Sequence, residues 1–564
     1  MLPKSRPGPL GASCLTCKRR HKKCDLRRPI CKRCELGRFK CDGYGHNRRG
    51  PAHDALPPTP TDFSHSTSSG PEKGNIISWV SSRPGARSGD TATTSSPRSL
   101  TSPELGPEKI GSPDRGSQYA LVDRQTNRVE DYLRLFTTRS NPEASTSPMS
   151  ILRKIINLQT QLPHSHMDPL KIFLNHSWFV DYILEQSDKF MDHWYFKPVN
   201  YPQKRSRKDV VLRLQNSLVT RWVAFIGMSI LESFFAGDMS QDPLHNAWIG
   251  YIEGSLKREL MHDLAPRTIQ ERRSDWIHVS MIKTRVIHSA NTYQVLRSMT
   301  PTFLQVVFSE PQLWTNGCDP TNIPLSNILG SEAHEVVYFA LIDCTYSMAT
   351  GLPQQVEYDT TIYASSRSSP QPNSSSSYQW AHSSPTEFQL VLTDINACRD
   401  KSTTARDWRD IEQWLLAWQS RPAEYKFTES WMTVAWYAVQ ESWRLALLVY
   451  MYMAVCGISS DDSRIQSCIR QIIQVVGTIK KHGNSDANVS FFVQYLVVGI
   501  CARSEAHRKL ARDKLSAQTR LWLLRAFDFV PVLDHLWHGA AAGGRPIKWV
   551  DYMRSREAML PIVV

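Results

Sequence analysis

Six cysteines near the start of the chain constrain its fold more than any other feature. A gap of two residues followed by a gap of six occurs twice, and the cysteines are Cys14, Cys17, Cys24, Cys31, Cys34 and Cys41. Structural zinc takes four tetrahedral ligands, and thiolate sulfur is one of its usual donors. Two separate four-sulfur sites need eight cysteines, so six can hold two Zn2+ ions only if two sulfurs bridge both. Because Cys14 and Cys31 each begin one half of the repeat, we expect these two to be the bridges.

The gap between the second and third cysteines is filled with basic residues. It contains Lys18, Arg19, Arg20, His21, Lys22 and Lys23. Residues 1–50 hold 15 Lys and Arg against three acids, so about +12 of the chain's net charge of +14 lies there. A positive charge this concentrated is typical of a module that binds a polyanion. We therefore expect these side chains to face DNA from the end of a short helix that begins at Cys14 or Cys17.

This arrangement resembles the fungal Zn(2)-Cys(6) binuclear-cluster transcription factors. The resemblance covers about residues 14–44 and rests on all six cysteine spacings, on the basic residues after Cys17 and on Pro29, two residues before Cys31. It implies zinc-dependent binding in the major groove of double-stranded DNA at CGG-type half-sites, as a candidate homodimer. It also implies regulation of RNA polymerase II transcription in the nucleus, with the transcription machinery or co-regulators as partners.

The resemblance assigns roles within the basic run. Arg20 and His21 occupy the two positions that usually touch base edges, and arginine suits the two acceptors of guanine. The other four cations (Lys18, Arg19, Lys22 and Lys23) suit phosphates, which supply affinity without sequence information. His21 departs from the family pattern, because lysine or arginine is commoner there.

Other classes of protein fit the sequence less well. A disulfide framework is disfavoured because the remaining six cysteines are scattered and Met1–Pro7 has no apolar leader. A zinc-stabilised nuclear interaction or scaffold protein without specific DNA binding remains the alternative, although it leaves the cationic gap unexplained. We also predict that the chain is not an enzyme: His334-Glu335 begins like a zinc-protease helix, but Tyr338 stands where the second histidine is needed.

Composition divides the chain into a small cluster domain, a disordered linker and a large all-α regulatory domain. The linker is rich in Ser, Pro and Thr and cannot bury enough apolar surface to fold. We expect the helical domain to sense a metabolite or a partner. The predicted parts are a flexible basic arm at 1–13, the Zn2Cys6 DNA-binding domain at 14–44, the linker at 45–117, a helical or dimerisation segment at 118–162, and the all-α domain at 168–564 with a disordered Ser-rich loop near 364–385.

Helical periodicity makes specific predictions within these parts. Ile151, Ile155, Leu158 and Leu162 form a seam of two heptads, too short for a coiled coil, so a helix docked on the body is favoured over a dimerisation helix. Trp276–Met299 is expected to be one helix that stops before Pro301, and Glu335–Thr350 one that stops at Gly351. The longest apolar run, Leu445–Cys456, is too short to span a membrane and is expected to be a buried helix.

Overall fold

The computed structural model separates the chain into two units, residues Met1–Ile110 and Gly111–Val564. The predictions made for the arm at 1–13, for the linker at 45–117 and for residues 118–146 lie outside the described residues. The structure describes residues 14–20, 24–25, 27, 30–42, 147–161, 168–191, 195–196, 198–199, 203–314, 318–361, 379–420, 425–479, 489–517 and 524–564.

The described part of the first unit contains two five-residue helices, α1 (Leu15–Arg19) and α2 (Lys32–Leu36). Helices this short are not stable alone in water, because nucleation costs more than so few hydrogen bonds return. The buried residues in and directly before these helices are Cys14, Thr16, Cys17, Cys31 and Cys34, and the four cysteines with Cys24 and Cys41 form the core. The side chains at the centre of this unit are therefore its thiols.

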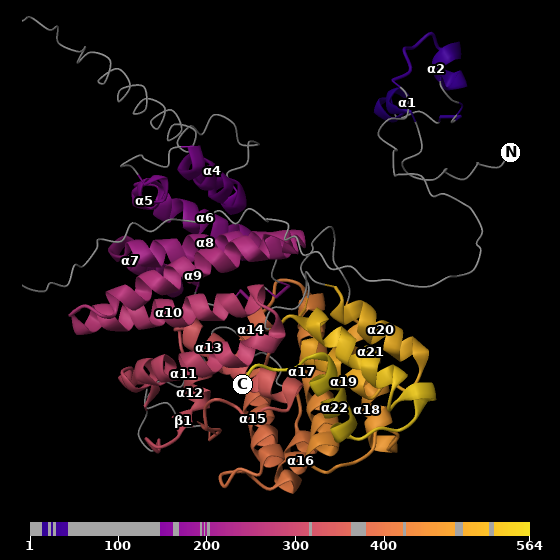
Figure 1. Ribbon diagram of the computed structural model, residues 1–564. Helices are drawn as coiled ribbons and strands as arrows, with labels where there is room; N and C mark the ends of the chain where they lie inside the picture. The colour runs from indigo at the N-terminus through magenta and orange to yellow at the C-terminus, as the bar shows by residue number, and fades with distance from the viewer. Residues whose placement is uncertain are drawn as a thin grey trace, which may run out of the picture. The chain divides into compact units, whose positions relative to one another are not determined.

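The described part of the second unit is almost wholly helical (Figure 1). Its one pair of strands is a two-residue parallel ladder, β1 (Ile323–Pro324) with β2 (Tyr358–Asp359), a small addition to the predicted all-α domain. The α-helices are α4 (Pro148–Gln161), α5 (Pro169–Asn175), α6 (Phe179–Met191), α7 (Gln203–Asn216), α8 (Leu218–Ala236), α9 (Asp242–Glu259), α10 (Pro266–Val286), α11 (Thr292–Phe308), α12 (Leu325–Leu329), α13 (His334–Thr350), α14 (Gln379–His382), α15 (Thr386–Asp400), α16 (Trp408–Ala417), α17 (Ser430–Ala454), α18 (Ser463–Gly477), α19 (Phe492–Ile500), α20 (Glu505–Leu515), α21 (Val530–His538) and α22 (Trp549–Met559).

Two apolar cores lie within the described part of this unit, and α10 contributes to both. The smaller core is formed by α4 to α9, and the larger core by α11 to α22. Val279 and Val286 of α10 belong to the smaller core, whereas Ile277 and Met281 belong to the larger. In Figure 1, α8, α9 and α10 lie as stacked layers, and α10 contacts α8 and α9 on one side and α11 and α13 on the other. The helix α10 therefore joins the two cores.

The central helix α13 follows the sequence prediction closely. It ends at Gly351, whose φ of 72° is the left-handed conformation that glycine adopts without strain. Every residue from Glu335 to Thr350 is buried. A helix that is buried on all sides is expected at the centre of a large domain, and α13 occupies that place.

The seam at 150–162 is buried in the second unit. Ile151, Ile155 and Leu158 of α4 are at most 4% exposed, and Ile151 and Ile155 pack in the smaller core. Leu162 lies outside the described residues. The helix contacts α8 and α5. The docked arrangement is thus the one found, and these side chains are not available for a dimer seam.

The predicted single helix over Trp276–Met299 is wrong. The chain breaks after Val286, and α11 begins at Thr292 and continues through Pro301 to Phe308. A residue distant in sequence stabilises this break, because the Ser289 N–H donates a hydrogen bond to the Asp528 carboxylate at 2.8 Å. Beyond the proline, Phe303 and Val307 are fully buried, and burying two such side chains outweighs the roughly 3 kcal/mol that an internal proline costs.

The Ser-rich loop predicted near 364–385 is shorter than expected at its C-terminal end. Gln379–His382 form α14, and Ser383 and Ser384 are buried. The indole N–H of Trp443 donates to the Ser383 carbonyl at 2.8 Å, a contact across 60 positions of sequence. Residues 362–378 lie outside the described residues.

One helix among those described, α8, has the length and apolar composition of a membrane span, with 44% of its most apolar stretch buried. This is weak evidence, because a core helix of a water-soluble protein has the same properties. Val223, Phe225, Ile226 and Ile230 of α8 are buried in the smaller core. The helix also packs against α4, α6, α9 and α10, as a core helix does.

Candidate metal centre and nucleic-acid interface

The two short helices repeat one local geometry around the cysteines. The helix α1 begins one residue after Cys14, and α2 begins one residue after Cys31. The Cys17 N–H donates to the Cys14 sulfur at 3.3 Å, and the Cys34 N–H donates to the Cys31 sulfur at 3.3 Å. N–H groups in the first turn of a helix have no partner within the helix, so each leading sulfur accepts one of them. The repeated spacing in the sequence therefore becomes a repeated structure.

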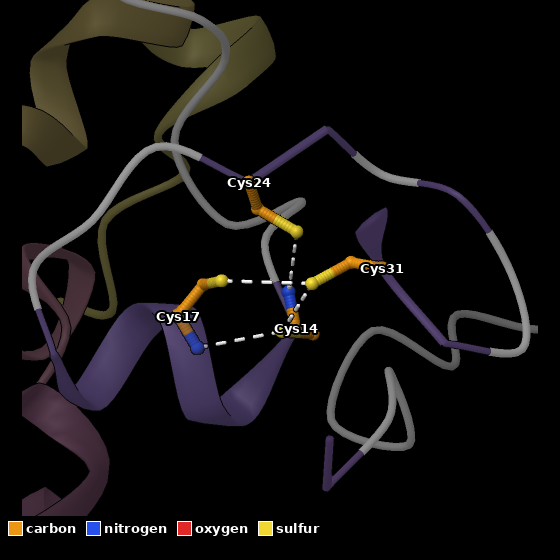
Figure 2. Close-up of side chains that lie close together, drawn as sticks. All are labelled: Cys14, Cys17, Cys24 and Cys31. Atoms are coloured by element: carbon orange, nitrogen blue, oxygen red, sulfur yellow. Dashed lines mark hydrogen bonds between the residues drawn. The ribbon is translucent and has the colours of Figure 1, made fainter. Parts of the chain in front are cut away.

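The sulfurs lie at separations that suit zinc. Cys31 Sγ is 3.6 Å from both Cys14 Sγ and Cys17 Sγ, and Cys34 Sγ is 3.8 Å from both of those atoms. Sulfurs about 2.3 Å from a tetrahedral zinc are about 3.8 Å apart. All twelve cysteines of the chain lie within the described residues and are free there. Figure 2 shows the sulfurs of Cys17, Cys24 and Cys31 pointing toward one another.

The six cysteines fall into two groups of four whose ligand atoms lie within 4.8 Å of one another. One group is Cys14, Cys17, Cys24 and Cys31, and the other is Cys14, Cys31, Cys34 and Cys41. The two groups share Cys14 and Cys31, the residues expected to bridge. Six sulfurs then supply eight coordination positions, so the cluster fits a binuclear Zn2Cys6 site.

Burial governs the protonation of these thiols. Desolvation raises the pKa of Cys14 and of Cys17 above the ordinary range for a thiol, and it raises the pKa of Cys34 to about 12. Without a cation the buried thiols are therefore neutral at pH 7. Zinc binds thiolate, so loading the cluster releases protons, and the binding energy also folds the site.

Two polar residues that the sequence analysis did not single out hold the cluster together. The Thr16 hydroxyl donates to the Lys40 carbonyl at 2.9 Å and accepts from the Asp42 N–H at 2.9 Å, so α1 is tied to the segment that carries Cys41. The Asp25 carboxylate accepts from the N–H groups of Lys32 and Arg33 at 3.0 and 3.2 Å. Desolvation raises the pKa of Asp25, but these backbone hydrogen bonds lower it more, and the net shift is downward. An aspartate this far from the helix that it caps gives no local capping signal in sequence.

The structure describes part of the predicted DNA-contacting set. Lys18 and Arg19 belong to the last turn of α1, and Arg20 follows it. Arg19 and Arg20 are exposed; Arg19 pairs with Asp42, and the Arg20 guanidinium lies 3.4 Å from the ring centroid of Phe39. The side chain of Lys18 and the whole of residues 21–23 lie outside the described residues. The structure thus places Arg19 and Arg20 at the exposed C-terminal end of α1.

Two protein-family models match the chain. The model described as the fungal Zn(2)-Cys(6) binuclear cluster domain matches residues 12–50, and the fungal specific transcription factor domain matches residues 332–562. No curated protein matches the chain. No solved structure matches it either.

The two matches agree with the geometry of the cluster. Both describe transcription factor domains rather than enzymes, and together they imply DNA binding, regulation of transcription and action in the nucleus. The second match begins just before α13, so the helices from α4 to α12 lie outside it. The chain combines a fungal Zn(2)-Cys(6) binuclear cluster domain with a fungal-specific transcription factor domain, the composition of the fungal Zn2Cys6 transcription factors.

Proposed function

We propose that the protein is a zinc-dependent, sequence-specific regulator of RNA polymerase II transcription that recognises CGG-type half-sites. The observation that carries the proposal is the pair of four-sulfur groups that share Cys14 and Cys31. In this proposal Cys14, Cys17, Cys24, Cys31, Cys34 and Cys41 hold two zinc ions, with Cys14 and Cys31 as the bridges. The ions fix α1 and α2 at the orientation in which the end of α1 meets DNA.

The proposed contacts divide by chemistry. Arg20 reads a guanine in the major groove, because its planar fork matches the two acceptors that guanine presents there. His21 reads the neighbouring base. Lys18, Arg19, Lys22 and Lys23 bind phosphates and set the affinity. The exposed position of Arg19 and Arg20 at the end of α1 supports this division.

The domain organisation is part of the same proposal. The cluster at 14–44 is the DNA-binding domain, residues 45–117 are the spacer, and the helical region at 168–564 is the regulatory domain. Because α4 is docked in the second unit, we place any dimerisation contact outside that helix.

Selection from a pool of random DNA duplexes by the zinc-loaded full chain tests the proposal. We expect enrichment of CGG or CCG, as a single triplet if the protein binds as a monomer and as two triplets at a fixed spacing if it binds as a dimer. Four phosphate contacts per half-site predict a slope of log affinity against log salt of about −3.6 per half-site. A pool without CGG or CCG would contradict the half-site. Binding that is insensitive to salt and sequence would instead support the scaffold alternative.

A further inference from the structure

A cavity of about 350 Å³ lies between the two apolar cores of the second unit. One wall comes from α6 and α8 of the smaller core and is apolar apart from Ser187. Cavities where separately packed bodies meet are common ligand sites. The side chains that form this wall are Ile183, Leu184, Ala224, Met228, Ile230 and Leu231.

The opposite wall is polar and is built from α10, α13 and α14. On α10 the lining residues are His278, Met281, Ile282 and Arg285, spaced by three, one and three positions, so they share one helical face. This face brings an imidazole and a guanidinium to the cavity, with apolar side chains between them.

Three histidine rings gather at the polar wall. The rings of His334 on α13 and His382 on α14 are stacked, with centroids 5.6 Å apart, and the His278 ring lies 6.4 Å from that of His334. Tyr338 lies 5.4 Å from His382, and its hydroxyl accepts a hydrogen bond from Arg285. Hydrogen-bonding groups from three helices therefore converge on one end of the cavity.

Burial keeps these imidazoles neutral. Desolvation lowers the pKa of His278 and that of His334 to about 4, and it lowers the pKa of His382 well below its usual range. The guanidinium of Arg285 brings a positive charge to the same end of the cavity. The wall thus offers a fixed cation and neutral hydrogen-bonding rings.

His382 carries the clearest sign of a missing partner. The residue is 6% exposed, and its buried Nε2 atom makes no hydrogen bond within the described part of the chain. Leaving a buried polar atom unsatisfied costs free energy, whereas a ligand that bonds to it recovers that cost. Val210 and Glu332 also line the cavity and are exposed, which gives a route to solvent.

The charges around Arg213 are already balanced by protein groups. Arg213 lies 3.2 Å from both Asp275 and Glu335, and Arg272 also pairs with Asp275. Arg272 also lies 3.4 Å from Glu259, so both arginines are paired with carboxylates of the protein. We assign the anchoring of a ligand to Arg285 and His382, because both line the cavity at the end where Arg285 donates to Tyr338 and where His382 Nε2 is buried.

We propose that this cavity binds a small amphipathic carboxylic acid. Its apolar body packs against α6 and α8, and its carboxylate bonds to Arg285 and His382. At about 30 Å³ per water-sized group, the cavity holds about a dozen non-hydrogen atoms. A metal ion fits the polar wall less well, because the only sets of three or more His, Cys, Asp or Glu ligand atoms within 4.8 Å among the described residues are the cysteine groups.

Calorimetric titration of the zinc-loaded full chain with three ten-carbon probes tests the site. The probes are decanoate, 1-decanol and decylamine, which differ only in the head group. We expect one decanoate per chain, bound at least about tenfold more tightly than decanol, because a charge-assisted hydrogen bond is worth about that factor or more. Decylamine should bind most weakly. Equal affinity for decanoate and decanol, or no binding of any probe, would overturn the proposal.

Three substitutions locate the site. Arg285→Met and His382→Leu should each weaken decanoate binding about tenfold and leave decanol binding nearly unchanged. Ala224→Phe fills the apolar end and should abolish binding of all three probes. Arg297→Met, at an exposed position on α11, is the control for removing a guanidinium and should bind as the parent does.

Far-UV circular dichroism and zinc content establish that each variant is folded. A folded Ala224→Phe variant that still binds decanoate at parent affinity would place the site elsewhere and overturn the proposal. The inference does not rest on the proposed DNA specificity, because probe binding is measured without DNA and DNA selection is carried out without the probe.

Discussion

The two described units of this protein are held together by different means. Among the described residues of the cluster the buried side chains are cysteines and Thr16, while Leu36 is 76% exposed and Ile30 48%. In the helical unit the centre is apolar: the rings of Phe303 and Phe339 are fully buried and stacked with centroids 4.1 Å apart. One unit has a core of sulfur, and the other has a core of hydrocarbon.

Size explains the difference. Below about 40 residues a chain buries too little surface to fold without disulfides, metals or oligomerisation. The cluster lies below that limit, and its described apolar residues Ile30 and Leu36 remain exposed. The helical unit is large enough for several layers of helices, so burial of apolar surface suffices. Zinc removal should therefore unfold the cluster, whereas loss of core volume should destabilise the helical unit.

Zinc removal is expected to have the largest effect. Structural zinc contributes about 10–16 kcal/mol of apparent binding free energy to a small zinc-dependent fold, so chelation should unfold residues 14–41 and abolish specific DNA binding. The cluster contains no tryptophan, so tryptophan fluorescence should not change. On one chelated sample, metal analysis measures the loss of zinc and a gel shift measures the loss of DNA binding. Fluorescence measures whether the helical unit is unchanged.

A pair of cysteine variants is the control for that experiment. Cys31→Ala removes a shared ligand and should lose both zinc ions, whereas Cys344→Ala removes a buried thiol of α13 and should keep both. An unchanged specific gel shift after chelation would refute the two-zinc assignment.

Loss of core volume should have the next largest effect, and only in the helical unit. Phe339→Ala is expected to lower the free energy of unfolding by about 3–5 kcal/mol, because it removes a buried ring and leaves a cavity. Urea unfolding followed by tryptophan fluorescence measures the change. Phe308→Ala, at a ring that is 53% exposed, should cost much less. Loss of zinc from folded Phe339→Ala protein would show that the two units are not independently stabilised.

Within the cluster, the two halves should respond differently to loss of an arginine. Arg20→Ala at the end of α1 is expected to weaken binding to the selected site by about 1–3 kcal/mol and to relax the base preference at one position. Arg33→Ala, in α2, should weaken binding by less and leave the preference unchanged. Competition binding against single-base variants of the site separates these outcomes.

The guanidinium of Arg20 lies against Phe39, so Arg20→Ala could also disturb the fold of the cluster. Measuring the zinc content of the variant distinguishes that effect from the loss of a DNA contact. If Arg20→Ala retains zinc and also retains its full base preference, Arg20 does not read the base assigned to it. Equal losses for Arg20→Ala and Arg33→Ala would remove the distinction between the halves.

The sequence by itself determined the features whose information is local. The cysteine spacing predicted two four-sulfur groups that share Cys14 and Cys31, because ligand number and chain spacing leave few arrangements. Helical periodicity and Gly351 likewise located α13, since a buried helix and its left-handed cap depend on neighbouring residues. The burial of Ile151 and Ile155 also followed from their spacing.

Only the tertiary structure decided the rest. Asp528 holds the break after α10, and buried Phe303 and Val307 carry α11 through Pro301, so distant contacts overrode a local stop signal. Trp443 fixes the residues after α14 in the same way. The cavity joins side chains of α6, α8, α10, α13 and α14 that no spacing rule relates. Local sequence patterns determine which segments form helices and which residues bind metal. Packing between segments distant in sequence determines where the helices end and where the cavity between them forms.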